Sequence, residues 1–125
     1  MRIEEMSGTR VLFIDDDGPP ISTNEDASDL ISSAWSAHVD FLVVPVHRLD
    51  PKFFQLDTLF AGDVLQKFVN YRIRLTVVGD IRRFVAQSQA LRDFVWESNR
   101  GDHVWFVDDE GDLAAKLAPR HPSIP

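Results

Sequence analysis

Short runs of consecutive apolar residues alternate along this chain with segments whose apolar residues recur every three or four positions. The runs are bounded by turn-forming Gly, Asp and Asn, which is typical of strands, and the spaced segments are typical of amphipathic helices. Continuous apolar strands are usually buried on both faces of a sheet, and strands that alternate with helices favour right-handed crossovers. The pattern therefore predicts an α/β fold, with helices on the faces of a mostly parallel sheet of about five strands.

The predicted strands cover residues 2–6, 11–14, 41–46, 72–78 and 103–107. Ser7-Gly8-Thr9, the link between the first two, is too short for a crossover, so we expect only this pair to be antiparallel. Side chains that can cap a first helical turn precede each predicted helix: Ser22 or Thr23, Asp57 or Thr58, Ser88, and Asp109 or Glu110. In the first helix we expect one inward stripe, formed by Ala27, Leu30, Ile31, Ala34 and Trp35.

The chain has 125 residues and no internal repeat or linker, which predicts one domain with a core of its own. We expect this single α/β domain to span residues 1–118. Pro119 should stop the last helix, which leaves residues 119–125 as a loose C-terminal tail.

Composition narrows the compartment and the partners. The chain has no cysteine, which removes disulfides and thiolate chemistry and fits a reducing compartment. It lacks the apolar run of a signal peptide, and its longest apolar run, residues 41–46, is far shorter than the ~20 residues of a membrane helix. The net charge of −7 disfavours binding to nucleic acid, which is also negatively charged. We therefore expect a cytoplasmic protein with no nucleic-acid or membrane partner.

Two motifs carry a family resemblance. Residues 65–72 read LQKFVNYR and lead to Val77-Val78-Gly79-Asp80, and residues 91–101 read LRDFVWESNRG. Over nearly its whole length the chain resembles an uncharacterised bacterial family, a domain of unknown function. The resemblance implies the fold without implying an activity.

The order of the predicted elements is also similar to that of STAS domains, which are small regulatory modules that bind partner proteins or nucleotides. This likeness implies an interaction module rather than an enzyme. Antagonists of that family carry a phosphorylatable serine, preceded by Asp, where the second helix begins. In this chain Asp57-Thr58 is the nearest match, and the position holds no serine.

Carboxylates follow several predicted strands, at the sheet edge where ligands bind in open α/β folds. Asp15, Asp17 and Asp80 could converge there on Mg²⁺, with Arg82 or Arg100 gripping an anion. Ordinary turn and cap chemistry also explains the aspartates. Glu97, Asn99 and Arg100 are further candidate ligand-binding residues, although helix termination accounts for the last two.

The chain contains no Gly-rich phosphate loop and no pair of histidines at metal-ligand spacing, so we expect no cofactor and no metal ligand set. Its aromatic content of 10% leaves two interpretations of Phe53, Phe54 and Trp96: they form a partner surface, with a homodimer as the simplest case, or they pack between helices and sheet. The leading interpretation is a non-catalytic STAS-like interaction or regulatory module. The alternative is an Mg²⁺-dependent enzyme or small-ligand binder that uses the strand-end carboxylates.

Overall fold

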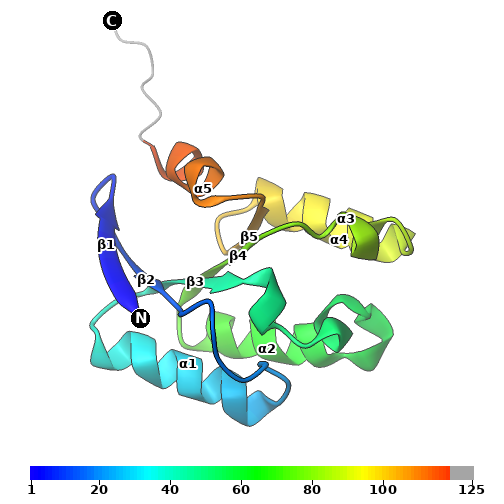
Figure 1. Cartoon of the computed structure of the whole chain (residues 1–125), viewed down its shortest axis with the longest axis horizontal. Helices are drawn as coiled ribbons and strands as arrows, with labels where there is room; N and C mark the ends of the chain where they lie inside the picture. Colours follow the sequence, from blue (N-terminus) through cyan, green and yellow to red (C-terminus); the bar gives the residue numbers. More distant parts are fainter. Residues whose placement is uncertain (119–125) are drawn as a thin grey trace, which may run out of the picture.

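The computed structural model of the chain describes residues 1–118, which contain a five-stranded sheet with helices on both faces (Figure 1). The strands lie in the sheet in chain order, and β1 is antiparallel to β2 while the other three pairs are parallel. They are β1 (Arg2–Met6), β2 (Thr9–Phe13), β3 (Phe41–Pro45), β4 (Arg74–Val78) and β5 (Val104–Val107). The predicted fold class is therefore confirmed, while the predicted tail, residues 119–125, lies outside the described residues.

The helices begin close to their predicted caps. They are α1 (Asn24–Ser36), α2 (Phe60–Asn70), α3 (Arg82–Val85), α4 (Gln89–Arg100) and α5 (Glu110–Leu117), with 3₁₀ segments η1 (Val46–Arg48), η2 (Pro51–Phe54) and η3 (Leu56–Thr58). Side-chain oxygens of Thr23, Ser88 and Asp109 accept backbone N–H groups at the starts of α1, α4 and α5. The cap predicted for α2 was wrong, because its N-cap is Leu59 in the left-handed region (φ 65°). The hydroxyl of Thr58 still accepts from the N–H of Phe60, at 3.3 Å.

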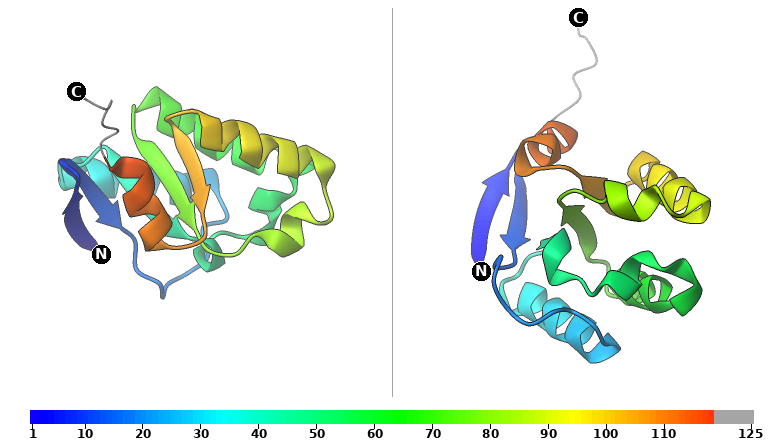
Figure 2. Two further views of the ribbon diagram at one scale, coloured as in Figure 1. Left: turned by 90° about the horizontal axis from the view of Figure 1, so that it is seen from above. Right: turned by 45° about the vertical axis from the view of Figure 1, so that its right-hand side comes forward.

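Of the four longer helices, three lie on one face of the sheet and one lies on the other, and the short α3 packs against the core on the three-helix side. Strands β2 to β5 follow chain order, so each crossover steps in the same direction along the sheet. Because these crossovers share the right-handed sense, α1, α2 and α4 lie on the same side (Figures 1 and 2). Their apolar residues form the larger core with alternate strand residues, including Leu12, Leu42, Leu75 and Val104. The prediction of helices on both faces holds, but their distribution is unequal.

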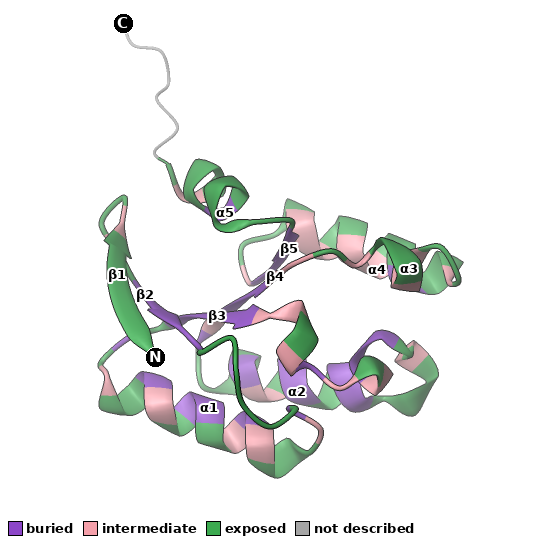
Figure 3. Ribbon diagram, in the orientation of Figure 1, coloured by how far each residue is buried: buried purple, intermediate pink, exposed green. Residues whose placement is uncertain are grey.

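The second face of the sheet is nevertheless buried (Figure 3). Its core comprises Val11, Phe13, Phe41, Val43, Trp105, Val107 and, from α5, Leu113. Long cationic side chains extend the cover of this single helix. The guanidinium of Arg2 lies 4.2 Å from the centroid of Phe13, and that of Arg74 lies 4.7 Å from that of Phe41. The methylene stems of such side chains shield apolar surface while their charged ends stay in contact with water.

Charged side chains protect the β1 edge of the sheet. Strand β1 is almost wholly exposed, and its sequence RIEEM places charges along that edge, which discourages pairing with another chain.

Within residues 1–118, none of the helices combines the length and the apolar composition that crossing a membrane requires.

Candidate functional site

A cavity of about 450 Å³ lies at the carboxyl edge of the parallel strands, where the sequence predicted a ligand site. Residues at the ends of β2, β3 and β4 line it together with the chain start and the first residue of α5. Its lining includes Phe13, Asp15, Asp16, His47, Val78 and Glu110. Asp15 is therefore the only one of the predicted site residues at this cavity.

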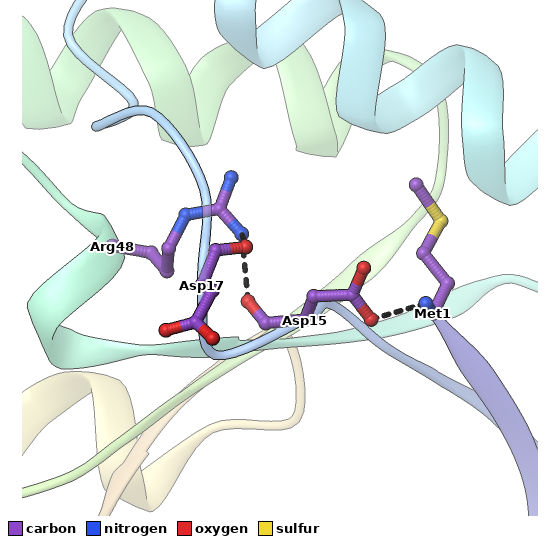
Figure 4. Close-up of polar contacts among 4 residues, drawn as sticks. All are labelled: Met1, Asp15, Asp17 and Arg48. Carbon is purple, nitrogen blue, oxygen red and sulfur yellow. Dashed lines mark hydrogen bonds and ion pairs between the residues drawn. The ribbon is translucent and has the colours of Figure 1, made fainter.

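The acidic loop after β2 does not gather its carboxylates. The carboxylate of Asp15 pairs with the amino group of Met1, which lowers the pKa of Asp15, and the carboxylate of Asp17 points away from it (Figure 4). The backbone carbonyls of Asp15 and Asp17 instead accept from Nη1 of Arg48, at 2.6 and 3.3 Å. The side chain of Arg48 therefore holds the loop through the backbone carbonyls of the loop, and the carboxylates remain at the surface.

Gly18 allows this close contact with Arg48. Its φ is +150°, and a Cβ built on it would lie 2.7 Å from the guanidinium carbon of Arg48. The Nε of Arg48 donates to the carbonyl of Pro19 at 3.2 Å. Nε2 of the neighbouring His47 lies 2.7 Å from the carbonyl of Asp16. Sequence reasoning missed the role of Arg48, because a partner that is a backbone carbonyl leaves no residue pattern behind.

Asp80 and Arg82 form a closed pair within one turn. The carboxylate of Asp80 accepts from the backbone N–H of Arg82 at 2.9 Å and from Nη2 of its guanidinium at 2.7 Å. These bonds lower the pKa of Asp80 to about 2. Neither residue lines the cavity that Asp15 lines. Within residues 1–118, no three His, Asp or Glu side chains are placed to share a metal ion.

The polar residues at the end of α4 bond to their own surroundings. Oδ1 of Asn99 accepts from the N–H of Phe106 at 2.7 Å, and its Nδ2 donates to the carbonyl of the same residue at 3.1 Å. Asn99 thus pairs with the outer edge of β5 as a further strand would. Glu97 lies 3.8 Å from Arg100, whose guanidinium is stacked 4.5 Å from the ring centroid of Trp96. These contacts give Glu97 and Asn99 structural partners, so neither needs a ligand.

A comparison with family models shows which family the chain belongs to. Residues 6–117 match the model of the Domain of unknown function (DUF4180). The chain belongs to the DUF4180 family. This confirms the resemblance to an uncharacterised family that the sequence suggested, and the family description carries no activity. Searches of curated proteins and of solved structures gave no match.

The DUF4180 domain places two of the three aromatic interface candidates inside its core. Phe53 and Phe54 are 1% and 3% exposed, and both pack against other phenylalanines, Phe54 by stacking on Phe84 at 4.3 Å. In this structure they offer no surface to a partner. Trp96 is 59% exposed on α4, under the guanidinium of Arg100.

Another aromatic pair is exposed on the helical face of the DUF4180 domain. Trp35 is 60% exposed, so its predicted place on the buried stripe of α1 was wrong, while Ala27, Leu30, Ile31 and Ala34 are buried as predicted. Its ring meets that of Tyr71, which is 49% exposed, edge to face at 5.7 Å. A hollow of about 380 Å³ lies beside the pair, between Ile31 and the serines Ser28, Ser32 and Ser36.

Proposed function

We propose that this DUF4180 domain is a non-catalytic interaction module that binds a second copy of itself. The binding surface is the α1–α2 patch, which we define as Ser28, Ile31, Ser32, Trp35, Ser36 and Tyr71. The exposed Trp35–Tyr71 pair carries the proposal. The likeness of the element order to STAS domains points to the same class of function.

The chemistry of the patch suits protein binding. Trp and Tyr bury large areas on association and lose little side-chain entropy, because each has only two rotatable side-chain bonds. The edge-to-face contact with Tyr71 restrains the ring of Trp35 before any partner arrives. The serines beside the pair are small and can bond to water in the free state, which keeps the exposed patch soluble.

Charge favours a second copy as the partner. The chain carries a net charge of −7, so most of its surface repels an identical surface. The patch contains no ionisable group except the phenol of Tyr71, so two copies can approach there without charge repulsion. A symmetric dimer also presents the same patch twice, which lets one exposed tryptophan serve both sides of the contact.

Sedimentation equilibrium of the wild type and of two matched variants tests the proposal. Trp35→Ser removes the central anchor, and Trp96→Ser removes a tryptophan of equal exposure from α4. We expect a wild-type dimer whose dissociation constant rises by about thirtyfold or more in Trp35→Ser, since an interface hot spot contributes ~2 kcal/mol or more. Trp96→Ser should leave the constant unchanged.

Other outcomes are equally definite. A dimer that only Trp96→Ser weakens would move the interface to α4, as the sequence suggested. A wild type that stays monomeric up to high micromolar concentration would reject self-association.

A further inference from the structure

A second hollow, of about 650 Å³, lies at the opposite edge of the sheet, where the parallel strands begin. It is bounded by the starts of β2, β4 and β5 and by the ends of α4 and α5. We call it the basic hollow, because its lining includes Arg74, Arg100 and Lys116, the first and last of which lie over the ring of Trp105. These three cations lie together in a chain whose net charge is −7.

Arg74 is held rigidly without a carboxylate. Its side chain is half-buried, with the guanidinium carbon 4.7 Å from the centroid of Phe41 and 4.8 Å from that of Trp105. Its Nε donates to the backbone carbonyl of Asp102 at 2.6 Å. Within residues 1–118, no ion pair involves Arg74 and no hydrogen bond uses its two terminal nitrogens, which leaves four N–H donors of the guanidinium available.

Lys116 adds a second cation to the same ring. Its Nζ lies 4.7 Å from the centroid of Trp105 and donates to the backbone carbonyl of Asn99 at 3.1 Å. Within the described part of the chain it forms no ion pair either. Both cations therefore contact neutral partners: a carbonyl and two aromatic rings for Arg74, and a carbonyl and one ring for Lys116.

An anion would stabilise this arrangement. Two positive charges near one ring repel each other, and the partial burial of Arg74 removes some of the water that would otherwise screen its charge, whereas Lys116 is exposed. Elsewhere in the domain the exposed arginines Arg2 and Arg82 do form ion pairs with carboxylates. Asp102 lines the basic hollow as well, yet Arg74 bonds to its backbone carbonyl rather than forming an ion pair with it.

We propose that the basic hollow binds a small organic anion through its phosphate or carboxylate groups. The planar fork of Arg74 would grip two oxygens of one such group, since a fixed guanidinium matches the geometry of either anion. Lys116 supplies further charge for a ligand with more than one negative group, and Arg100 lines the same hollow while also lying 3.8 Å from Glu97. This site is separate from the α1–α2 patch, and it stands or falls independently of the proposed self-association.

Fluorescence of a single tryptophan provides the test. The chain has three tryptophans, so the double variant Trp35→Phe/Trp96→Phe leaves only Trp105, whose ring contacts both cations. Pyrophosphate and citrate serve as the phosphate and carboxylate probes, titrated at an ionic strength held constant with KCl. We expect a saturable change in Trp105 emission with at least one of them, and the stronger probe identifies the preferred group.

Two charge variants in this background locate the binding. Lys116→Gln removes a cation of the hollow, and Arg83→Gln removes an exposed cation that stacks on Phe84 instead. We expect the probe to bind about tenfold or more weakly to Lys116→Gln, because a charged hydrogen bond is lost, and unchanged to Arg83→Gln. Absence of saturable binding to the parent, or equal weakening in both variants, would overturn the proposal.

Discussion

At the scale of single residues, two arginines hold loops of the domain through backbone carbonyls. Arg48 bonds to three backbone carbonyls of the loop after β2, those of Asp15, Asp17 and Pro19. Arg74 bonds to the carbonyl of Asp102. Backbone carbonyls exist at every position, so no residue pattern marks these contacts in advance. The aspartates themselves could be explained from the sequence, because local N–H groups satisfy Asp80 and Asp109 as turn and cap chemistry predicts.

Gly18→Ala tests the contact between the acidic loop and Arg48. The added methyl would meet the guanidinium at 2.7 Å, and the φ of +150° is strained for alanine. We expect a loss of about 1–2 kcal/mol in the free energy of unfolding, measured by urea denaturation. Gly62→Ala is the control, because it lies within α2 with nothing within 4 Å of a built Cβ and should stabilise by about 0.5–1 kcal/mol. A neutral Gly18→Ala would contradict this role for Arg48.

His103 makes stability depend on pH near neutrality. Burial lowers the pKa of His103 below 6.5, the charge of Arg74 adds to the effect, and its Nε2 is buried with no partner in the described residues. The unfolded chain then binds more protons than the folded one as the pH falls below 6.5, so stability is full above that pH and declines beneath it. We expect the loss of stability between pH 7.5 and pH 5.5 to be smaller in His103→Gln. Equal losses in urea titrations of both proteins would contradict the assignment.

At the scale of elements, the sequence predicted the five strands and the four longer helices, but not the short α3 and not how far each side of a helix is covered. The strands β2 to β5 and the caps Thr23, Ser88 and Asp109 could be read from apolar runs and capping side chains. Trp35 could not be placed, because it lies at the margin of the stripe of α1, where the position of α2 decides exposure. Phe53 was assigned to a candidate partner surface but is buried, and the sequence did not show this because η2 is too short for a helical period to indicate which of its side chains face inward.

Asn99 joins α4 to the edge of β5, and its substitution measures that link. Asn99→Ala leaves the N–H and carbonyl of Phe106 without their partner, which should cost about 1–3 kcal/mol in the free energy of unfolding. Asn70→Ala is the matched control, because Asn70 is exposed and its side chain bonds, among residues 1–118, to Gln66 alone, so the change should stay within about 0.5 kcal/mol. Equal effects of the two substitutions in urea denaturation would show that Asn99 does not secure the edge.

At the scale of the whole molecule, the sequential strand order creates the asymmetry on which both proposals depend. Three helices crowd one face of the sheet and leave the α1–α2 patch on their outer surface, with Trp35 exposed beside Tyr71. The other face has α5 alone, and Arg74 and Lys116 cover Trp105 where this helix ends. The sequence predicted helices on the faces, but it did not predict their unequal number, because strand order was not visible in it.

If two copies meet through the α1–α2 patch, a single cysteine introduced there should link them. The chain has no cysteine, so Ser32→Cys places one thiol in the patch, and Asp93→Cys places one on the exposed side of α4 as the control. Under mild oxidation at micromolar concentration, we expect Ser32→Cys to form a disulfide-linked dimer much faster than Asp93→Cys. Equal rates for the two variants, or a Ser32→Cys protein that stays monomeric while Asp93→Cys links, would contradict the account.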